Sequence, residues 1–332
     1  MHCYLSKKNR SYQKQMRKAL CVGINYYDYV SNLNGCVSDA KSMRNALSRH
    51  GDGTPNFSTE LCVADTQENA LSRGKLKDKI ELLFSGKTDS ALLYFSGHGY
   101  LENTGGYLIT SEVKRGDEGL AIQDILKIAA ESDARNKIII LDCCHAGITG
   151  NLSCNADFAL IKEGTTILTA CRAEEYAVET NGRGVFTSLL VEALTGGAMN
   201  LVGDVTPGSI YAYIDQALGP WEQRPMFKTN VQNFISLRKN KPPISLEDLH
   251  KLPILFKEQN IEYPLDPSYE PMSDTRNEEN TKIFAILQRY NRVNLLVPNG
   301  AEHMYYAAME SKSCVLTALG KHYWQLVKNG RI

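Results

Sequence analysis

Short apolar runs alternate with amphipathic stretches between residues 18 and 238. The runs Ala91–Phe95 and Ile138–Leu141 are apolar or aromatic at every position, which is typical of parallel strands buried on both faces. The stretches between such runs space their apolar residues at the period of an α-helix. This alternation predicts an α/β fold, with a mostly parallel sheet and helices on both of its faces.

The same pattern gives approximate bounds for the elements. A first helix is expected to begin near Ser38 or Asp39, either of which suits a helix N-cap, and to end near Arg49. A small hairpin is expected at 106–110. Strands are expected at 18–24, 61–63, 91–95, 137–141, 165–170 and 231–237, and further helices at 67–84, 121–131, 184–194 and 208–218.

Proline placement divides the rest of the chain. Residues 1–17 are a polar lead-in, whereas residues 239–277 carry Pro242, Pro243 and further prolines, which predicts a proline-rich linker. Residues 278–332 regain apolar periodicity and are expected to form a small, mainly helical C-terminal domain. The α/β domain is therefore predicted to span residues 18–238.

Composition narrows the classes of protein. The 332 residues include 37 basic and 37 acidic side chains, a balance that gives no electrostatic case for a nucleic-acid or membrane partner. No apolar run is long enough to span a bilayer. Nine cysteines, with no secretory leader in the polar N-terminus, favour a reducing, cytoplasmic location. The absence of a Cys-x-x-Cys pair argues against structural zinc.

Two strand ends carry reactive side chains. Cys143 and Cys144 follow one apolar run, and His98 follows another between two glycines. Because chemistry in parallel sheets lies at the carboxyl ends of strands, the pattern predicts a cysteine nucleophile with a histidine base. Neighbouring residues on an extended chain point to opposite faces, so one cysteine faces the cleft and the other is core. Consecutive residues, His145 included, cannot converge on one metal ion, so no metal site is expected.

The motifs around these side chains resemble those of the caspase-like cysteine peptidases, and most of all the bacterial and metacaspase branch. The two central motifs are SGHG at 96–99 and DCCHAG at 142–147. The resemblance covers roughly residues 18–238. Four further stretches agree in the same order: GINYY at 23–27, NGCVSDA at 34–40, ILTACRAEEYA at 167–177 and GVFTSLLVEAL at 184–194.

The resemblance implies a fold and a set of catalytic roles. It implies a caspase-like cysteine endopeptidase in which Cys144, two residues after the strand-end Asp142, is the nucleophile. His98 would be the base and acid, and the two would form a loose dyad. The backbone N–H groups of Gly99 and Cys144 would stabilise the oxyanion. Both cysteines being plain core residues is the alternative reading of the DCCH motif.

The resemblance also implies a substrate preference. Asp39 and Asp142 match the positions at which the metacaspase-like branch places acidic residues for the side chain before the cut, and Cys36 would line the same wall. Two carboxylates bind a guanidinium or ammonium group and repel an aspartate. Cleavage is therefore expected after Arg, with Lys second. The open alternatives are a helix N-cap for Asp39 and a loop-ordering role for Asp142.

No cofactor is expected. Some metacaspases require calcium, but Asp117, Glu118 and Asp157 do not form a dense cluster of oxygen ligands, so calcium activation is disfavoured. The partners expected are a protein substrate with a basic residue before the cut, and an activating small molecule or protein at the C-terminal domain.

Aromatic and polar residues concentrate in the C-terminal domain. A packed helical module with an aromatic core explains them most simply. A sensor that gates the peptidase is the sharper hypothesis, and its candidate ligand-binding residues are Arg292, Glu302, His303, Tyr305 and Tyr306. A winged-helix unit that contacts nucleic acid is disfavoured. The chain is accordingly expected to be a gated intracellular effector, as in bacterial antiviral defence or regulated cell death, with a silent caspase-like scaffold as the competing hypothesis.

Overall fold

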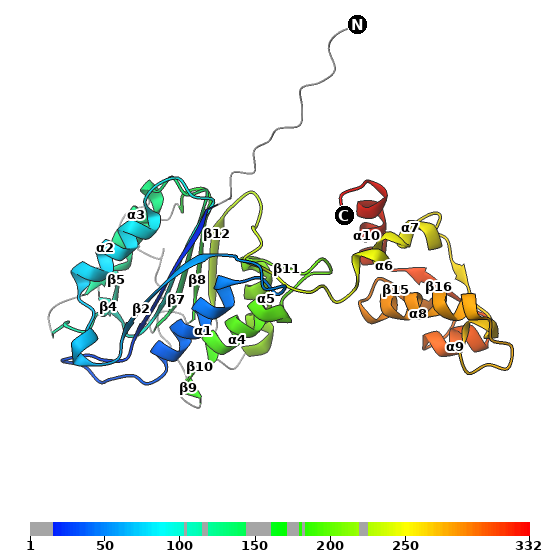
Figure 1. Ribbon diagram of the computed structural model, residues 1–332, viewed down its shortest axis with the longest axis horizontal. Coiled ribbons are helices and arrows are strands. Elements are labelled where there is room, and N and C mark those ends of the chain that lie inside the picture. Colours follow the sequence, from blue (N-terminus) through cyan, green and yellow to red (C-terminus); the bar gives the residue numbers. More distant parts are fainter. Residues whose placement is uncertain are drawn as a thin grey trace, which may run out of the picture. The chain divides into compact units, whose positions relative to one another are not determined.

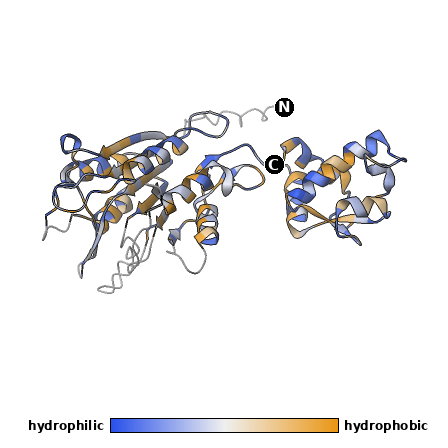
Figure 2. Ribbon diagram, turned by 90° about the horizontal axis from the view of Figure 1, so that it is seen from below, coloured by the Kyte–Doolittle hydropathy of each residue, from blue (hydrophilic) through white to orange (hydrophobic). Residues whose placement is uncertain are grey.

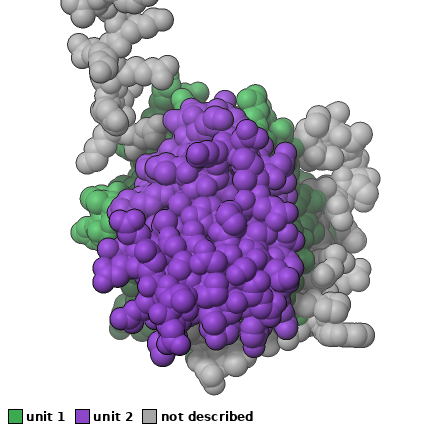
Figure 3. Space-filling view, turned by 90° about the vertical axis from the view of Figure 1, so that its right-hand side faces the viewer, with its two compact units in different colours: residues 1–199, 204–240 green, residues 200–203, 241–332 purple. Residues whose placement is uncertain are grey.

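The chain forms two compact units in the computed structural model, which describes residues 16–102, 105–114, 119–143, 161–170, 179–180, 183–218 and 225–332. Figure 3 colours the two units separately. Unit 1 comprises Met1–Met199 and Asp204–Asn240, and unit 2 comprises Asn200–Gly203 and Lys241–Ile332.

Unit 1 is built on a six-stranded sheet (Figure 1). Five strands are parallel, and the edge strand β12 runs antiparallel to its neighbour β8. This confirms the mostly parallel sheet. In spatial order the strands are β12 (Met226–Asn230), β8 (Thr165–Thr169), β7 (Asn136–Asp142), β3 (Ser90–Ser96), β1 (Arg17–Ile24) and β2 (Ser58–Ala64).

Helices cover both faces of this sheet, as predicted (Figure 1). Leu93 and Phe95 of β3 pack against α2 (Arg73–Phe84) and α3 (Ile122–Glu131). Leu92 and Tyr94 point the other way, because side chains alternate along a strand. They pack with α1 (Cys36–Ser48), α4 (Val185–Glu192) and α5 (Pro207–Leu218). Figure 2 shows the apolar residues gathered along the central strands.

The register of the strands brings three carboxyl ends together. Gly23 of β1 pairs with Ser96 of β3, and Ser96 pairs with Asp142 of β7. The chain runs from β1 outward to β2 and then returns to the other side of β1 to form β3. Such a reversal of strand order opens a crevice at the carboxyl ends, where ligands bind in α/β proteins.

The smaller elements of unit 1 lie at the margins of the sheet. A three-stranded antiparallel sheet, β4-β5-β6, contains the expected hairpin, and two short strand pairs, β9-β10 and β11-β13, complete the unit. Their bounds are β4 (Gly99–Glu102), β5 (Gly105–Leu108), β6 (Leu120–Ala121), β9 (Glu179–Thr180), β10 (Arg183–Gly184), β11 (Asp204–Val205), β13 (Arg238–Lys239), η1 (Gln67–Asn69) and η4 (Ala193–Gly197).

Two predicted boundaries in unit 1 are wrong. The closing strand is β12, at Met226–Asn230, and not the apolar stretch 231–237, which follows it without strand pairing. The first helix begins at Cys36, so Asp39 lies inside its first turn and is not the N-cap. The side chain of Asn25 replaces a local cap, since its oxygen accepts from the Val37 N–H at 3.2 Å.

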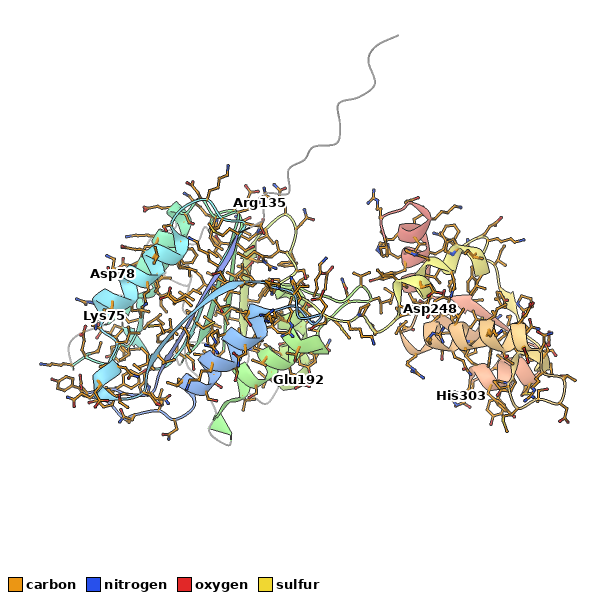
Figure 4. The ribbon with its side chains drawn as sticks, in the orientation of Figure 1. Lys75, Asp78, Arg135, Glu192, Asp248 and His303 are labelled. Atoms are coloured by element: carbon orange, nitrogen blue, oxygen red, sulfur yellow. The ribbon has the colours of Figure 1, made fainter. Side chains whose placement is uncertain are left out.

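Unit 2 combines helices with a small antiparallel sheet, β14-β16-β15. Asp248 on its first helix (Figure 4) forms an ion pair of 2.8 Å with Arg289. The elements are α6 (Leu246–His250), α7 (Leu252–Leu255), β14 (Tyr263–Pro264), η5 (Pro267–Tyr269), α8 (Glu278–Arg292), β15 (Leu296–Asn299), α9 (Met304–Met309), β16 (Ser313–Leu316) and α10 (Ala318–Lys328).

The predicted linker 239–277 is not a linker, because nearly all of it belongs to unit 2 and several of its side chains lie in the core of that unit. Leu252, Phe256 and Leu265 are buried there with residues of α8 and α10. The indole N–H of Trp324 donates to the Phe256 carbonyl at 2.6 Å. The prolines in this segment therefore mark turns within a packed unit. Among the described helices, none is both long and apolar enough to cross a bilayer.

Phe256→Ala tests this placement of the proline-rich segment. The Phe256 side chain is fully buried, so its truncation should lower the free energy of unfolding of unit 2 by about 3–5 kcal/mol. Urea unfolding followed by far-UV circular dichroism measures the loss. Ile254→Ala is the matched control, because Ile254 lies in the same segment and is 71% exposed. Equal stability of the two variants would mean that the segment is a linker after all.

Candidate active site

His98 lies at the carboxyl end of the sheet, two residues beyond β3. Its backbone N–H donates to the Tyr27 hydroxyl at 2.8 Å, and the two ring centroids are 4.8 Å apart. Gly97 permits this contact, since a Cβ there would come within 2.7 Å of the Tyr27 oxygen. The Gly97 N–H donates to the Asp142 carbonyl at 3.3 Å. The histidine turn is therefore tied to the end of β7, directly before Cys143.

One ring nitrogen of His98 has a carbonyl partner. Its Nε2 lies 2.8 Å from the carbonyl oxygen of Ser31. A carbonyl oxygen can only accept, so Nε2 carries a proton, and Nδ1 of a neutral ring keeps its lone pair. The loop around Ser31 is fixed in turn, because the Asn32 side chain accepts from the Tyr27 N–H at 2.7 Å. His98 is thus oriented to take up a proton at Nδ1.

Of the two cysteines in the DCCH motif, the structure describes only Cys143. Cys143 is buried and packs in the apolar cluster on the α2 and α3 face. Burial raises the pKa of Tyr27 well above its usual value, the hydrogen bond from His98 lowers it, and the nearby thiols of Cys36 and Cys143 raise it. Cys143 therefore fits the predicted core position. Cys144, the predicted nucleophile, lies outside the described residues.

Gly99 begins β4 directly after His98. It pairs with Leu108 of β5, and the Ile109 N–H donates to the His98 carbonyl at 3.0 Å. In an antiparallel ladder this bond flanks a pair that is not hydrogen-bonded, so the Gly99 N–H points away from β5. An outward N–H can donate to an anionic oxygen, and the predicted oxyanion role of Gly99 stays a prediction.

Asp39 and Asp142 meet at Gly184. The Asp39 carboxylate, 2% exposed, accepts the Gly184 N–H at 3.2 Å. A Cβ built on Gly184 would lie 2.9 Å from Oδ2 of Asp142 and 3.3 Å from Oδ2 of Asp39. The two carboxylate oxygens are thus separated by less than the sum of these distances. Two buried carboxylates this close give the site a negative potential, and their predicted role in binding a basic side chain stays a prediction.

Thr187 of α4 fixes the Asp142 carboxylate. Its hydroxyl donates to Oδ2 of Asp142 at 2.5 Å. The fully buried Tyr94 hydroxyl lies 2.5 Å from the same threonine oxygen. Because the threonine proton goes to the Asp142 carboxylate, which can only accept, the tyrosine hydroxyl donates to the threonine oxygen. Burial raises the pKa of Tyr94 well above its usual value, and the charges of Asp142 and Asp39 raise it further. Tyr94 therefore stays protonated and completes a Tyr94–Thr187–Asp142 chain.

The structure thus brings together most of the predicted residues that it describes. His98, Gly99 and Asp142 lie at adjoining strand ends, and Asp39 reaches them from α1. Cys36 begins α1 and lies near Tyr27. The sequence reading missed Tyr27, Tyr94 and Thr187. Tyr27 and Thr187 lie inside quoted motifs, but nothing in the letters alone assigns them a partner.

The five candidate residues of the C-terminal domain only partly cluster. The His303 ring (Figure 4) stacks on Tyr306 with centroids 6.1 Å apart, and Tyr305 meets Tyr306 edge-on at 5.3 Å. Glu302 lies 3.9 Å from His303. Arg292 ends α8, and no ion pair or ring contact joins it to the other four in the part of the chain that is described. Their proposed ligand-binding role stays a prediction.

The described residues contain no group of His, Cys, Asp and Glu side chains arranged to hold a metal ion. Asp117, Glu118 and Asp157, which were weighed for calcium, lie outside the described residues.

Comparison with known proteins identifies a family. The family model for the caspase domain, Peptidase C14, matches residues 16–243. The chain is 32% identical over 108 residues to Metacaspase-1 of Eremothecium gossypii, covering 29% of this chain and 23% of that protein. It is 28% identical over 150 residues to Metacaspase-6 of Arabidopsis thaliana, covering 40% of this chain and 38% of that protein. These matches span less than half of the relatives' length.

Similarity to solved structures is more distant. Caspase-1 from Spodoptera frugiperda aligns with a TM-score of 0.49 and 13% identity, covering 72% of this chain and 98% of that one. Protein GSU0716 from Geobacter sulfurreducens aligns with a TM-score of 0.49 and 19% identity, covering 68% of this chain and 98% of that one.

Thr187→Val tests the hydrogen-bond chain below the carboxylates. Valine keeps the shape of threonine but removes the hydroxyl that Asp142 and Tyr94 share, which should cost about 1–3 kcal/mol of unfolding free energy. Urea unfolding measures the change, and Thr187→Ser is the control that keeps the hydroxyl. A valine variant as stable as the wild type would show that the chain does not hold Asp142.

Proposed function

The chain belongs to the caspase-domain family, and on that premise we propose that it is a cysteine endopeptidase that cleaves proteins after arginine, with lysine second. The observation that carries this proposal is the pair of buried carboxylates, Asp39 and Asp142, beside the His98 turn. Family membership supplies the reaction class, and the carboxylate pair supplies the preference.

The proposed chemistry uses the free nitrogen of His98. The Cys144 thiol gives its proton to Nδ1, and the thiolate sulfur attacks the carbonyl carbon of the peptide bond. The imidazolium then returns that proton to the leaving amine as the C–N bond breaks, which leaves a thioester on Cys144. Water then gives a proton to His98 and attacks the thioester carbon, the C–S bond breaks to release the carboxylate product, and the proton on His98 returns to the Cys144 sulfur. The bond from Nε2 to Ser31 keeps the ring oriented in both steps.

The charge that develops on the carbonyl oxygen needs donors. The outward N–H of Gly99 and the N–H of Cys144 are the proposed pair. Gly99 is held in β4 by its pairing with Leu108, and Cys144 follows the end of β7 by two residues in the sequence. Preorganised donors need no rearrangement during the reaction.

The carboxylate pair supports a basic side chain before the cut. A guanidinium group offers paired N–H donors that match two carboxylates, and lysine offers a single ammonium. An aspartate side chain would face two negative charges in a buried site and would be repelled. The Tyr94–Thr187 chain supports this role by holding the Asp142 carboxylate in place.

The biological setting is part of the proposal. We place the enzyme in the cytoplasm, which is supported by the five cysteines of the described residues, none of which is in a disulfide. We propose that it is a gated effector, in bacterial defence or regulated cell death, with unit 2 receiving the activating molecule or protein. A silent scaffold is the competing function, and peptidase activity distinguishes the two.

Asp39→Asn and Asp142→Asn test the preference. Each change removes one charge but keeps the shape, and kcat/KM for an arginine peptide should fall roughly 10- to 100-fold. For a matched peptide with citrulline, the neutral counterpart of arginine, the same substitutions should change kcat/KM little. Asp78→Asn on the exposed face of α2 (Figure 4) is the control and should leave kcat/KM unchanged. The Cys144→Ala and His98→Ala variants set the background.

The outcomes separate the parts of this proposal. Arginine and citrulline peptides cleaved equally well by the wild type would overturn the carboxylate pocket while leaving a peptidase. Cleavage that persists in Cys144→Ala would overturn the dyad. Inactivity under all conditions, including added cell extract as a source of activator, would favour the scaffold.

A further inference from the structure

A cavity of about 810 Å³ lies at the opposite edge of the sheet from His98. Its walls include Arg17 at the start of β1 and Lys137 at the start of β7, together with Gly164 just before β8. These strands are parallel, so their amino ends share this edge. Arg135 in Figure 4 marks it. The cavity is therefore separate from the site at the carboxyl ends.

The walls of this cavity carry more positive than negative charge. Both acidic side chains already have partners: Asp89 lies 3.8 Å from the Arg135 guanidinium and accepts from the Ser90 hydroxyl at 3.1 Å, and Glu163 accepts from the Gln232 amide at 2.8 Å. The basic residues of the lining are Arg17, Arg135, Lys137 and Lys239, against Asp89 and Glu163 as the acidic ones. The excess charge is positive, although the whole chain is neutral.

Lys137 is the central observation. It is only 6% exposed, and its Nζ donates to the backbone carbonyl of Glu163 at 2.8 Å. An ammonium group has three donors, and this bond uses one. Within the described residues, no carboxylate lies at ion-pair distance from Nζ. Burial, followed by the charge of Lys162, lowers the pKa of Lys137, while Glu163 raises it. A buried cation without a counter-charge is costly, and a bound anion would offset that cost.

Nζ of Lys137 borders the cavity and not the core. A Cβ built on Gly164, which also lines the cavity, would come within 3.3 Å of it. Arg17 adds a partly buried cation on the other face of the sheet: its guanidinium contacts Asn56, donates to the Ser236 carbonyl at 2.7 Å and feels the charge of Asp89. Its Nε is buried and has no hydrogen-bond partner among the residues that the structure describes.

The lining also includes an aromatic ring and side-chain amides. Phe234 is 42% exposed, and Gln232 and Asn233 precede it in the lining. A cavity of this size holds a ligand as large as a nucleotide. We propose that this cavity binds a small phosphate-bearing molecule, with its phosphate against Lys137. The site is independent of the proposed peptidase activity, because it shares no residue with the catalytic end.

Binding to the full-length chain tests the proposal. Inorganic pyrophosphate and magnesium-free ATP are the probes, with chloride at matched ionic strength as the reference, and calorimetry gives Kd. Both probes should bind and raise Tm. Tighter binding of ATP than of pyrophosphate would assign the site to nucleotides. Equal Kd values for the two probes would show that the site recognises the phosphate groups alone. Lys137→Met should weaken binding at least tenfold, and Lys75→Met on the exposed face of α2 should not (Figure 4).

A second variant guards against misfolding. Arg135 has a side chain that is 78% exposed, so Arg135→Gln should fold normally and still weaken binding severalfold. Absence of binding by both probes would overturn the proposal. So would binding that is equally tight in the wild type, Lys137→Met and Arg135→Gln.

Discussion

The buried carboxylates of Asp39 and Asp142 lie side by side, and residues of several elements of unit 1 hold them there. Like charges repel strongly in a site of low polarity, so Asp39 and Asp142 need donors that hold them there. The Gly184 N–H supplies one donor and the Thr187 hydroxyl another. These donors come from the start of α4, while the carboxylates come from α1 and β7. Hydrogen bonds to the two carboxylates therefore connect three separate elements, α1, β7 and α4.

The two faces of the sheet carry different groups at its carboxyl edge. Alternation along β3 sends Tyr94 toward α1 and α4, where it supports Asp142 through Thr187, and sends Phe95 toward α2 and α3. Tyr27 and Cys143 pack on that second side, next to His98. The proposed binding of the basic side chain and the proposed proton transfer thus occupy opposite faces of the same strand ends. A peptide lying across the edge would reach both.

The sequence predicted those features that depend on residues close together in the chain. Unbroken apolar runs revealed the parallel strands, and the glycines around His98 placed it at a strand end. The Tyr94–Thr187 contact could not be predicted, because it joins residues 93 positions apart and Tyr94 reads as one more core residue. The cap of α1 comes from Asn25 for a similar reason. The prolines of 239–277 suggested a linker, but burial of Phe256 and Leu265 in unit 2 depends on tertiary packing that composition does not encode.

Covalent labelling tests the central claim most directly. Peptide ketones that trap a cysteine nucleophile would be offered with arginine, citrulline or aspartate as the last residue, and mass spectrometry would locate the label. Our account predicts modification of Cys144 by the arginine reagent, much slower modification by the citrulline reagent and none by the aspartate reagent. Preferential labelling by the aspartate reagent, or labelling of a cysteine other than Cys144, would contradict it.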